Sequence, residues 1–207
     1  MTETATREAY DGLADTYAEL FTTAFEGNPL DRGMHDAFAE LVTGAIADLG
    51  CGPGRVTAYL HSRGLDVFGM DLSPRMVTLA RQAYPDLRFE QGSMTGVPVE
   101  DASLGGIVAR YSVIHTQPEE LPVIFAEFAR VLAPGGHLLI SFYAHDGAEL
   151  AEPFDHKVTR AYRLSPDGVA GLLAEAGLKE IARLERQPNE GERFLQGCLL
   201  LRKDPAV

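Results

Sequence analysis

The sequence predicts an α/β domain in which helices cover both faces of a mainly parallel sheet. Three observations support this class. An apolar run at 45–49 passes directly into three glycines and then into a helical pattern, which predicts a strand, a tight turn and a helix. Strand-like runs then alternate with helical stretches, an order that builds a parallel sheet. The 207 residues suit one domain of this kind.

The N-terminal segment predicts two helices ahead of the first strand. Residues 3–21 carry apolar side chains at spacings of three and four between acidic ones, which predicts an amphipathic helix or a broken pair of helices. The stretch 28–33 breaks this pattern. A second helix is therefore expected over about 34–42, with Gly44 after its end.

The middle of the chain predicts strands joined by helices with clear end signals. Ser73 and the proline after it supply an N-cap and an N1 proline for a helix over 74–83. A proline and two glycines at 134–136 stop another helix over 125–132, and a third begins at Arg55. The five strands between these helices are expected at 45–49, 66–71, 87–90, 106–109 and 137–142.

The last third of the chain predicts a polar insert and the end of the sheet. Residues 143–164 are rich in His, Asp, Glu and Arg and predict an irregular insert. Ser165 then caps a last helix that ends at Gly177. Strands near 178–186 and 194–202 are expected to close the sheet as an antiparallel pair.

Composition excludes several classes of function. Eighteen basic and thirty acidic side chains give a net charge of −12, which repels a phosphate backbone, so no nucleic-acid partner is expected. Cys51 and Cys198 are the only cysteines, which predicts neither a disulfide framework nor a metal cluster and indicates a reducing cytoplasm. No signal-peptide pattern and no apolar run of about 18 residues is present, so neither export nor a membrane span is expected.

The glycine turn after the first strand predicts a cofactor cradle. Gly50, Gly52 and Gly54 lack Cβ atoms, so the backbone can take positive φ and a ligand can lie against it. The spacing is G-x-G-x-G, whereas the dinucleotide fingerprint is G-x-G-x-x-G. Asp48 precedes the turn, and its carboxylate would repel a diphosphate but could hold an ammonium group.

The run Asp48-Leu49-Gly50-Cys51-Gly52-Pro53-Gly54-Arg55 resembles the first motif of the class I S-adenosylmethionine-dependent methyltransferases of small-molecule type. The block Arg-Val-Leu-Ala-Pro-Gly-Gly-His-Leu-Leu-Ile at 130–140 is also similar to that family. The resemblance implies a Rossmann-like, seven-stranded, mainly parallel sheet with S-adenosyl-L-methionine as cofactor. The single domain would divide into a helical lid (1–44), a cofactor-binding core (45–142), an acceptor-side insert (143–165), and a C-terminal helix and strand pair (166–207).

The resemblance places the cofactor contacts beyond the carboxyl ends of the strands. Asp71 ends the second strand, where a carboxylate can accept hydrogen bonds from both ribose hydroxyls, although it could instead cap a helix. Ser93 stands where the family usually carries an acid that accepts from the adenine amino group. The residues predicted to bind the cofactor are Tyr17, Asp48, Gly50, Cys51, Gly52, Gly54, Arg55, Asp71, Leu72, Met76, Ser93, Met94 and Arg110.

Two further assignments have open alternatives, and both follow from the resemblance. Tyr17 would close the N-terminal lid over the cofactor, with Tyr10 as a weaker candidate; the alternative is a plain core aromatic. Arg110 would touch the methionine moiety; the alternative is an ion pair with a lid acid or near the cofactor's carboxylate.

The acceptor side carries one candidate catalytic base. His115 follows the fourth strand, and imidazole has the pKa that suits proton removal near neutrality, although a structural histidine is the alternative. Tyr111, Tyr143 and His145 are predicted to contact the acceptor, the alternative for the insert being a solvated loop. No metal site is predicted, because no acidic ligand set accompanies His145.

These features predict a cytoplasmic S-adenosylmethionine-dependent methyltransferase, a monomer or homodimer, that acts on a small-molecule acceptor by in-line methyl transfer. The protein would supply proximity, alignment and a dry site. The main alternative keeps the fold and the cofactor but serves a non-methylating reaction such as cyclisation in a biosynthetic pathway. A nicotinamide dehydrogenase and a non-catalytic binding protein are weaker alternatives.

Overall fold

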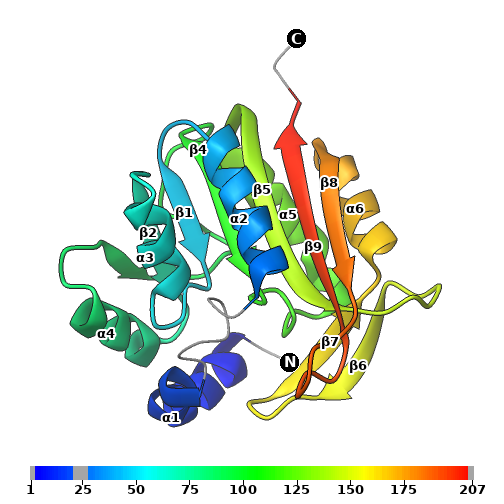
Figure 1. The fold of residues 1–207 in the computed structure, drawn as a ribbon, viewed down its shortest axis with the longest axis horizontal. Coiled ribbons are helices and arrows are strands. Elements are labelled where there is room, and N and C mark those ends of the chain that lie inside the picture. The colour runs from blue at the N-terminus through cyan, green and yellow to red at the C-terminus, as the bar shows by residue number, and fades with distance from the viewer. Residues whose placement is uncertain (1–2, 21–27, 205–207) are drawn as a thin grey trace.

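A computed structural model describes residues 3–20 and 28–204, without the side chains of residues 15–20. Five parallel strands form the centre of one sheet in the order β3-β2-β1-β4-β5 (Figure 1). The three strands at its middle, β2, β1 and β4, are largely buried and apolar, as expected of strands that are covered on both faces. The strands are β1 (Ile46–Leu49), β2 (Val67–Asp71), β3 (Phe89–Gln91), β4 (Leu104–Arg110) and β5 (Leu132–Ala144).

Two C-terminal strands complete the predicted seven. β9 (Leu195–Lys203) runs antiparallel to β5 along its length, and β8 (Leu178–Arg186) runs antiparallel to β9. The mainly parallel sheet with an antiparallel C-terminal strand pair is therefore confirmed. β8 has no second neighbour among the described strands, which makes it an edge of the sheet.

The prediction of an irregular insert is wrong, because a hairpin adds two more strands there. β6 (Ala151–Asp155) and β7 (Arg160–Leu164) pair with each other, and β7 pairs with β5 only at Ala144. Most side chains of this hairpin are half-buried or exposed, so its sequence lacks the apolar alternation that marks a strand. Tertiary contacts stabilise it instead: the ring centroid of Phe154 lies 4.7 Å from that of Phe194.

Helices cover both faces of the sheet. Apolar side chains of α2 (Pro29–Leu41) and α3 (Arg55–Ser62) pack with β1 and β4 on one face, where α4 (Pro74–Ala83) covers β2 and β3. α5 (Leu121–Val131), which follows the short helix η1 (Pro118–Glu120), packs with α6 (Pro166–Glu175) on the other face. Figure 1 shows α2 in front of the sheet and α5 behind it. Within the described ranges no helix combines the length and apolar character needed to cross a bilayer.

α2 begins earlier than predicted. The side chain of Asn28 accepts hydrogen bonds from the backbone N–H groups of Leu30 and Asp31 at 3.1 and 3.2 Å, and Pro29 occupies the first helical turn. The stretch expected to break the helix is therefore its cap and first turn. α2 also packs on the sheet with Phe38 fully buried, so of the two lid helices that the structure describes, α1 (Glu3–Leu20) alone reaches the site described below.

α1 lies at the carboxyl edge of the sheet, below the ends of β1 and β4 in Figure 1. Asp11 connects it to the start of α4, because its carboxylate accepts a hydrogen bond from the Ser73 hydroxyl at 2.5 Å. The backbone N–H of Arg75 lies 3.4 Å from the same oxygen. A carboxylate beside the N-terminus of α4 also faces the positive end of the helix dipole.

A buried ion-pair network ties α2 to the C-terminal strands. The Arg186 guanidinium, with its side chain 7% exposed, donates to both carboxylate oxygens of Asp31 at 3.0 and 3.3 Å. It also donates to both oxygens of Glu192, at 2.5 and 2.8 Å. A third charge joins the network, since Arg110 lies 3.8 Å from Asp31.

We expect Arg186→Ala to lower the free energy of unfolding by about 3 kcal/mol, because it leaves the buried carboxylate of Asp31 without its main partner. The matched control is Arg183→Ala on the same strand, whose ion pairs are exposed and should contribute less than about 1 kcal/mol. Urea denaturation of both variants measures the difference. Equal losses of unfolding free energy in the two variants would show that the buried network at Arg186 stabilises the protein no more than the exposed ion pairs of Arg183 do.

Candidate cofactor and acceptor site

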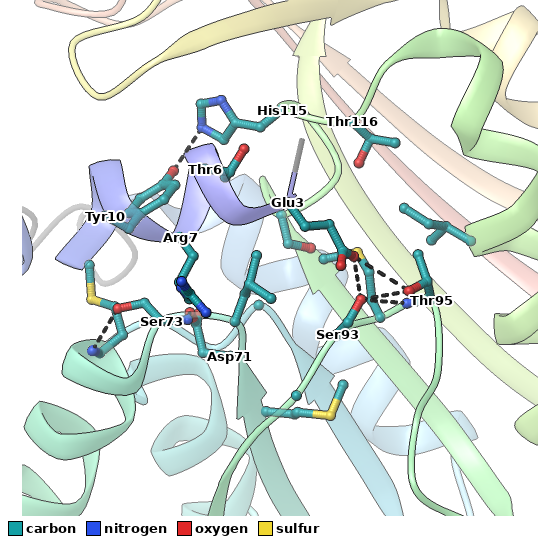
Figure 2. A pocket seen from close by; sticks show the side chains of 18 of the residues that line it. Glu3, Thr6, Arg7, Tyr10, Asp71, Ser73, Ser93, Thr95, His115 and Thr116 are labelled. Carbon is teal, nitrogen blue, oxygen red and sulfur yellow. Dashed lines mark hydrogen bonds between the residues drawn. The ribbon is translucent and has the colours of Figure 1, made fainter. Parts of the chain in front are cut away.

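A cavity of about 600 Å³ lies at the carboxyl edge of the sheet beneath α1. Its floor comes from the ends of β1, β2, β3 and β4, the usual place for ligands in an open α/β sheet. α1 forms one wall with side chains that recur every three or four residues on one helix face (Figure 2). These are Glu3, Thr6, Arg7 and Tyr10.

The predicted glycine turn forms part of the cavity floor, but the absence of a side chain has a different structural reason at each of its three glycines. A Cβ on Gly50 would come within 2.3 Å of the Ser112 Cβ, so Gly50 lets the turn and the loop after β4 approach each other. A Cβ on Gly52 would meet nothing within 4 Å, so its bare backbone faces open space. A Cβ on Gly54 would clash with the Phe89 ring at 2.6 Å, which makes it a packing residue.

Asp71 ends β2 at the cavity, as predicted, and its carboxylate is held by backbone groups. Oδ2 accepts from the N–H of Gly52 at 2.8 Å, and Oδ1 accepts from the N–H of Ser73 at 2.9 Å. Burial raises the pKa of this carboxyl, and the two backbone hydrogen bonds oppose the rise. Ser73 is the N-cap of α4, where its hydroxyl accepts from Met76 N–H at 3.1 Å, so Asp71 is not the helix cap. Each oxygen of Asp71 keeps a lone pair for a ligand.

Asp48 was expected to meet the cofactor's ammonium group, but it does not line the cavity. It lies within β1, is 1% exposed, and accepts a hydrogen bond from the Thr57 hydroxyl on α3 at 2.6 Å. Burial raises its pKa to about 7. Asp48 therefore joins α3 to β1, a contact that spacing along the chain could not reveal.

Three neighbours of the turn that were also predicted as cofactor contacts are absent from the cavity lining: Cys51, Gly54 and Arg55. Cys51 is buried against α4 and β3, and burial raises the pKa of its thiol. The side chain of Tyr17 lies outside the part of the chain that the structure describes. The remaining predicted contacts do line the cavity: Gly50, Gly52, Asp71, Leu72, Met76, Ser93, Met94 and Arg110.

Arg110 lines the cavity and also contacts an acid of the predicted lid. Its side chain lines the cavity at the end of β4, and its guanidinium lies 3.8 Å from Asp31. The guanidinium also stacks over the Tyr111 ring at 4.9 Å, and Tyr111 lines the cavity as well. Arg110 thus places a positive charge where an anionic group of a ligand could lie.

His115 lines the cavity in a defined tautomer. Its Nδ1 lies 2.9 Å from the carbonyl oxygen of Arg160, which can only accept, so Nδ1 carries the proton. Nε2 is then the acceptor, and the Tyr10 hydroxyl donates to it at 2.8 Å (Figure 2). Burial lowers the pKa of His115, so the ring is held neutral near pH 7. The histidine is therefore oriented as a proton acceptor toward the cavity.

The two insert residues predicted to contact the acceptor lie behind or beyond the cavity wall. Tyr143 packs against Tyr111 with ring centroids 5.0 Å apart, so it supports the wall from behind. His145 lines a second pocket, where its Nδ1 lies 3.5 Å from Glu152. The chain leaves β5 after Ala144 and turns into the β6–β7 hairpin, which draws His145 away from the site.

Sequence reasoning missed most of the α1 wall. Glu3 and Arg7 were not singled out, and Tyr10 was a weaker candidate than Tyr17, although the three lie at helical spacing on one face. That polar spacing was the available signal, but the helix was assessed by its apolar face. Figure 2 shows Arg7 pointing toward Asp71 and Glu3 facing Ser93 and Thr95.

Sequence comparisons identify relatives of the chain. Residues 46–136 match a family model described as a methyltransferase domain. A demethylmenaquinone methyltransferase of Chlorobaculum parvum is 37% identical over 152 residues, which are 73% of this chain and 59% of that protein. Across the curated relatives, the chain spans between 38% and 59% of their lengths.

Solved structures share the fold at low sequence identity. The 1,6-didemethyltoxoflavin-N1-methyltransferase of Burkholderia thailandensis, with 1,6-didemethyltoxoflavin and S-adenosylhomocysteine bound, has a TM-score of 0.68 at 21% identity over 90% of this chain and 86% of that chain. The [4+2]-cyclase SpnF has a TM-score of 0.75 at 16% identity over 100% of this chain and 98% of that chain. The matched domain, the strand order and the glycine turn bonded to Asp71 all fit the family that the motifs indicate. The chain belongs to the class I S-adenosylmethionine-dependent methyltransferase family.

Proposed function

We propose that this protein transfers the methyl group of S-adenosyl-L-methionine to a small-molecule acceptor, with His115 as the base that takes the acceptor's proton. The observation that carries the proposal is the neutral His115, whose Nε2 accepts a hydrogen bond inside the cavity. A cavity of about 600 Å³ beneath α1 and a net charge of −12 favour a small acceptor over a nucleic acid. Relatives are named for small acceptors, demethylmenaquinone and trans-aconitate.

The cavity residues fit the cofactor chemically. The open space beside Gly52 admits a nucleoside against bare backbone, and Asp71 keeps lone pairs for ribose hydroxyls. Arg110 would attract the carboxylate of the methionine moiety, while Leu72 and Met76 supply apolar surface. The bound cofactor supplies a sulfonium whose methyl group is already activated.

The role of His115 follows from its two hydrogen bonds. The Arg160 carbonyl holds the Nδ1 proton and orients the ring, so the Nε2 lone pair faces the Tyr10 hydroxyl. An acceptor hydroxyl or amine that replaces the Tyr10 hydroxyl would donate its proton to the same atom. His115 would take this proton as the acceptor attacks the methyl group. The Tyr10 side chain would move aside when the acceptor enters.

A cyclisation receives no support from the structural neighbour that performs one, because likeness at 16% identity shows the fold alone. Product masses distinguish the two functions. A product heavier than its substrate by one methyl group, with S-adenosylhomocysteine formed in equal amount, supports methyl transfer. A product of unchanged mass would contradict it.

Asp71→Ala should weaken S-adenosylhomocysteine binding by roughly 1–3 kcal/mol, because charge-assisted hydrogen bonds to the ribose are lost. Calorimetric titration measures the dissociation constant. Asp66→Ala is the matched control, since Asp66 is exposed just before the other end of β2. An unchanged affinity in Asp71→Ala would remove Asp71 from the cofactor site.

His115→Gln should lower kcat by about 100-fold or more, the usual contribution of a positioned base. Its affinity for S-adenosylhomocysteine should stay close to that of the unaltered protein, because His115 serves the acceptor. Screening small molecules for a one-methyl gain in mass identifies an acceptor for the assay. His61→Gln, on an exposed part of α3, is the control. An equal kcat in the unaltered protein, His115→Gln and His61→Gln would show that His115 has a structural role and is not the base.

The pH profile of kcat should report the same histidine. Burial lowers the pKa of His115 below 6.5, so the neutral, active form persists from alkaline pH down to about that value. Below it, protonation removes the Nε2 lone pair and kcat should fall. A kcat that still rises with pH above about 7.5 would contradict this assignment, because the titrating group would then have a raised pKa.

A further inference from the structure

One corner of the cavity is closed by a contact between α1 and the loop after β3 (Figure 2). The Ser93 hydroxyl donates a hydrogen bond to Oε1 of Glu3, and the Thr95 hydroxyl lies 3.4 Å from the same oxygen. This corner adjoins Asp71, because β2 pairs with β3 through Asp71 and Gln91. The N–H of Gly92 also donates to the carbonyl of Asp71 at 3.0 Å.

The hydrogen bonds of Ser93 leave it no acceptor capacity. Its hydroxyl oxygen accepts from the backbone N–H of Thr95 at 3.1 Å, and the Thr95 hydroxyl lies 2.7 Å away. The close contact with Glu3 requires the one hydrogen of Ser93, so the Thr95 hydroxyl must donate to Ser93. A hydroxyl has only two lone pairs, and both are then in use. Ser93 therefore cannot accept a further hydrogen bond from a ligand.

The free acceptor in this corner is Glu3. A carboxylate offers about four lone-pair sites, and only Oε1 of Glu3 has partners. Its Oε2 takes no hydrogen bond from any residue in 3–20 or 28–204. The corner therefore presents a negative acceptor that Ser93 holds in place.

We propose that Glu3 accepts a hydrogen bond from the 6-amino group of the cofactor's adenine and so selects adenine over bases that lack this group. The proposal rests on the proposed function, which places the ribose at Asp71 and so brings the base to the adjoining corner. A carboxylate strengthens the bond by its charge. Ser93 and Thr95 are positioning residues for Glu3. A 6-oxo base would instead turn an oxygen toward the carboxylate and be repelled.

Calorimetric titration with two ligands tests the proposal: S-adenosylhomocysteine and S-inosylhomocysteine, in which oxygen replaces the 6-amino group. The unaltered protein should bind the adenosyl ligand roughly 10- to 100-fold more tightly. Glu3→Ala should lose most of this preference, because its affinity for the adenosyl ligand falls while that for the inosyl ligand holds or rises. Glu3→Gln keeps an acceptor without the charge and should show an intermediate preference.

The control is Glu8→Ala, since Glu8 is exposed on α1 and does not line the cavity; its ligand preference should be unchanged. A loss of affinity in Glu3→Ala that is equal for both ligands would make Glu3 a latch for α1 only and overturn the proposal. An unchanged preference would overturn it too and leave the cofactor site intact. If the unaltered protein binds neither ligand, the proposed function fails together with the proposal.

Discussion

The hydrogen bond from the Gly52 N–H to the Asp71 carboxylate is the contact on which the site depends. It joins the turn after β1 to the end of β2, and two further N–H groups of that turn, from Gly50 and Cys51, donate to the carbonyl of Met70 at 2.7 and 3.1 Å. The turn is therefore attached along the end of the neighbouring strand. Without a Cβ on Gly52, the same attachment leaves bare backbone exposed beside a carboxylate. The two features that suit a nucleoside are parts of one hydrogen-bonded unit.

α1 completes the cavity above this unit. Among the side chains that the structure describes, its polar face makes three connections, each to the loop after a different strand: Asp11 to Ser73 after β2, Glu3 to Ser93 after β3, and Tyr10 to His115 after β4. Two of these connections end on groups with proposed ligand roles. In the proposed site only the hydrogen bond between Tyr10 and His115 would be exchanged for one to a ligand, while Ser93 keeps Glu3 in position.

The parts of the site that sequence predicted are those set by local pattern. Asp71 and the glycine turn were found because strand ends and turns have characteristic residues, and Ser73 because an N-cap followed by proline starts a helix. Other features depend on tertiary packing that local pattern does not show. Asp48 turns toward Thr57 through the packing of α3, and the β6–β7 hairpin is held by aromatic contacts, not by alternation of its own side chains. The role proposed for Glu3 depends on the packing of α1 against the loop after β3, which the sequence does not show.

The central claim is that a nucleoside lies against the Gly52 backbone while Asp71 binds its ribose. A crystal structure with S-adenosylhomocysteine tests this most directly. The account predicts both ribose hydroxyls within hydrogen-bond distance of the Asp71 carboxylate, with the Gly52–Asp71 hydrogen bond retained. A ligand bound elsewhere, or a carboxylate turned away from the ribose, would contradict it.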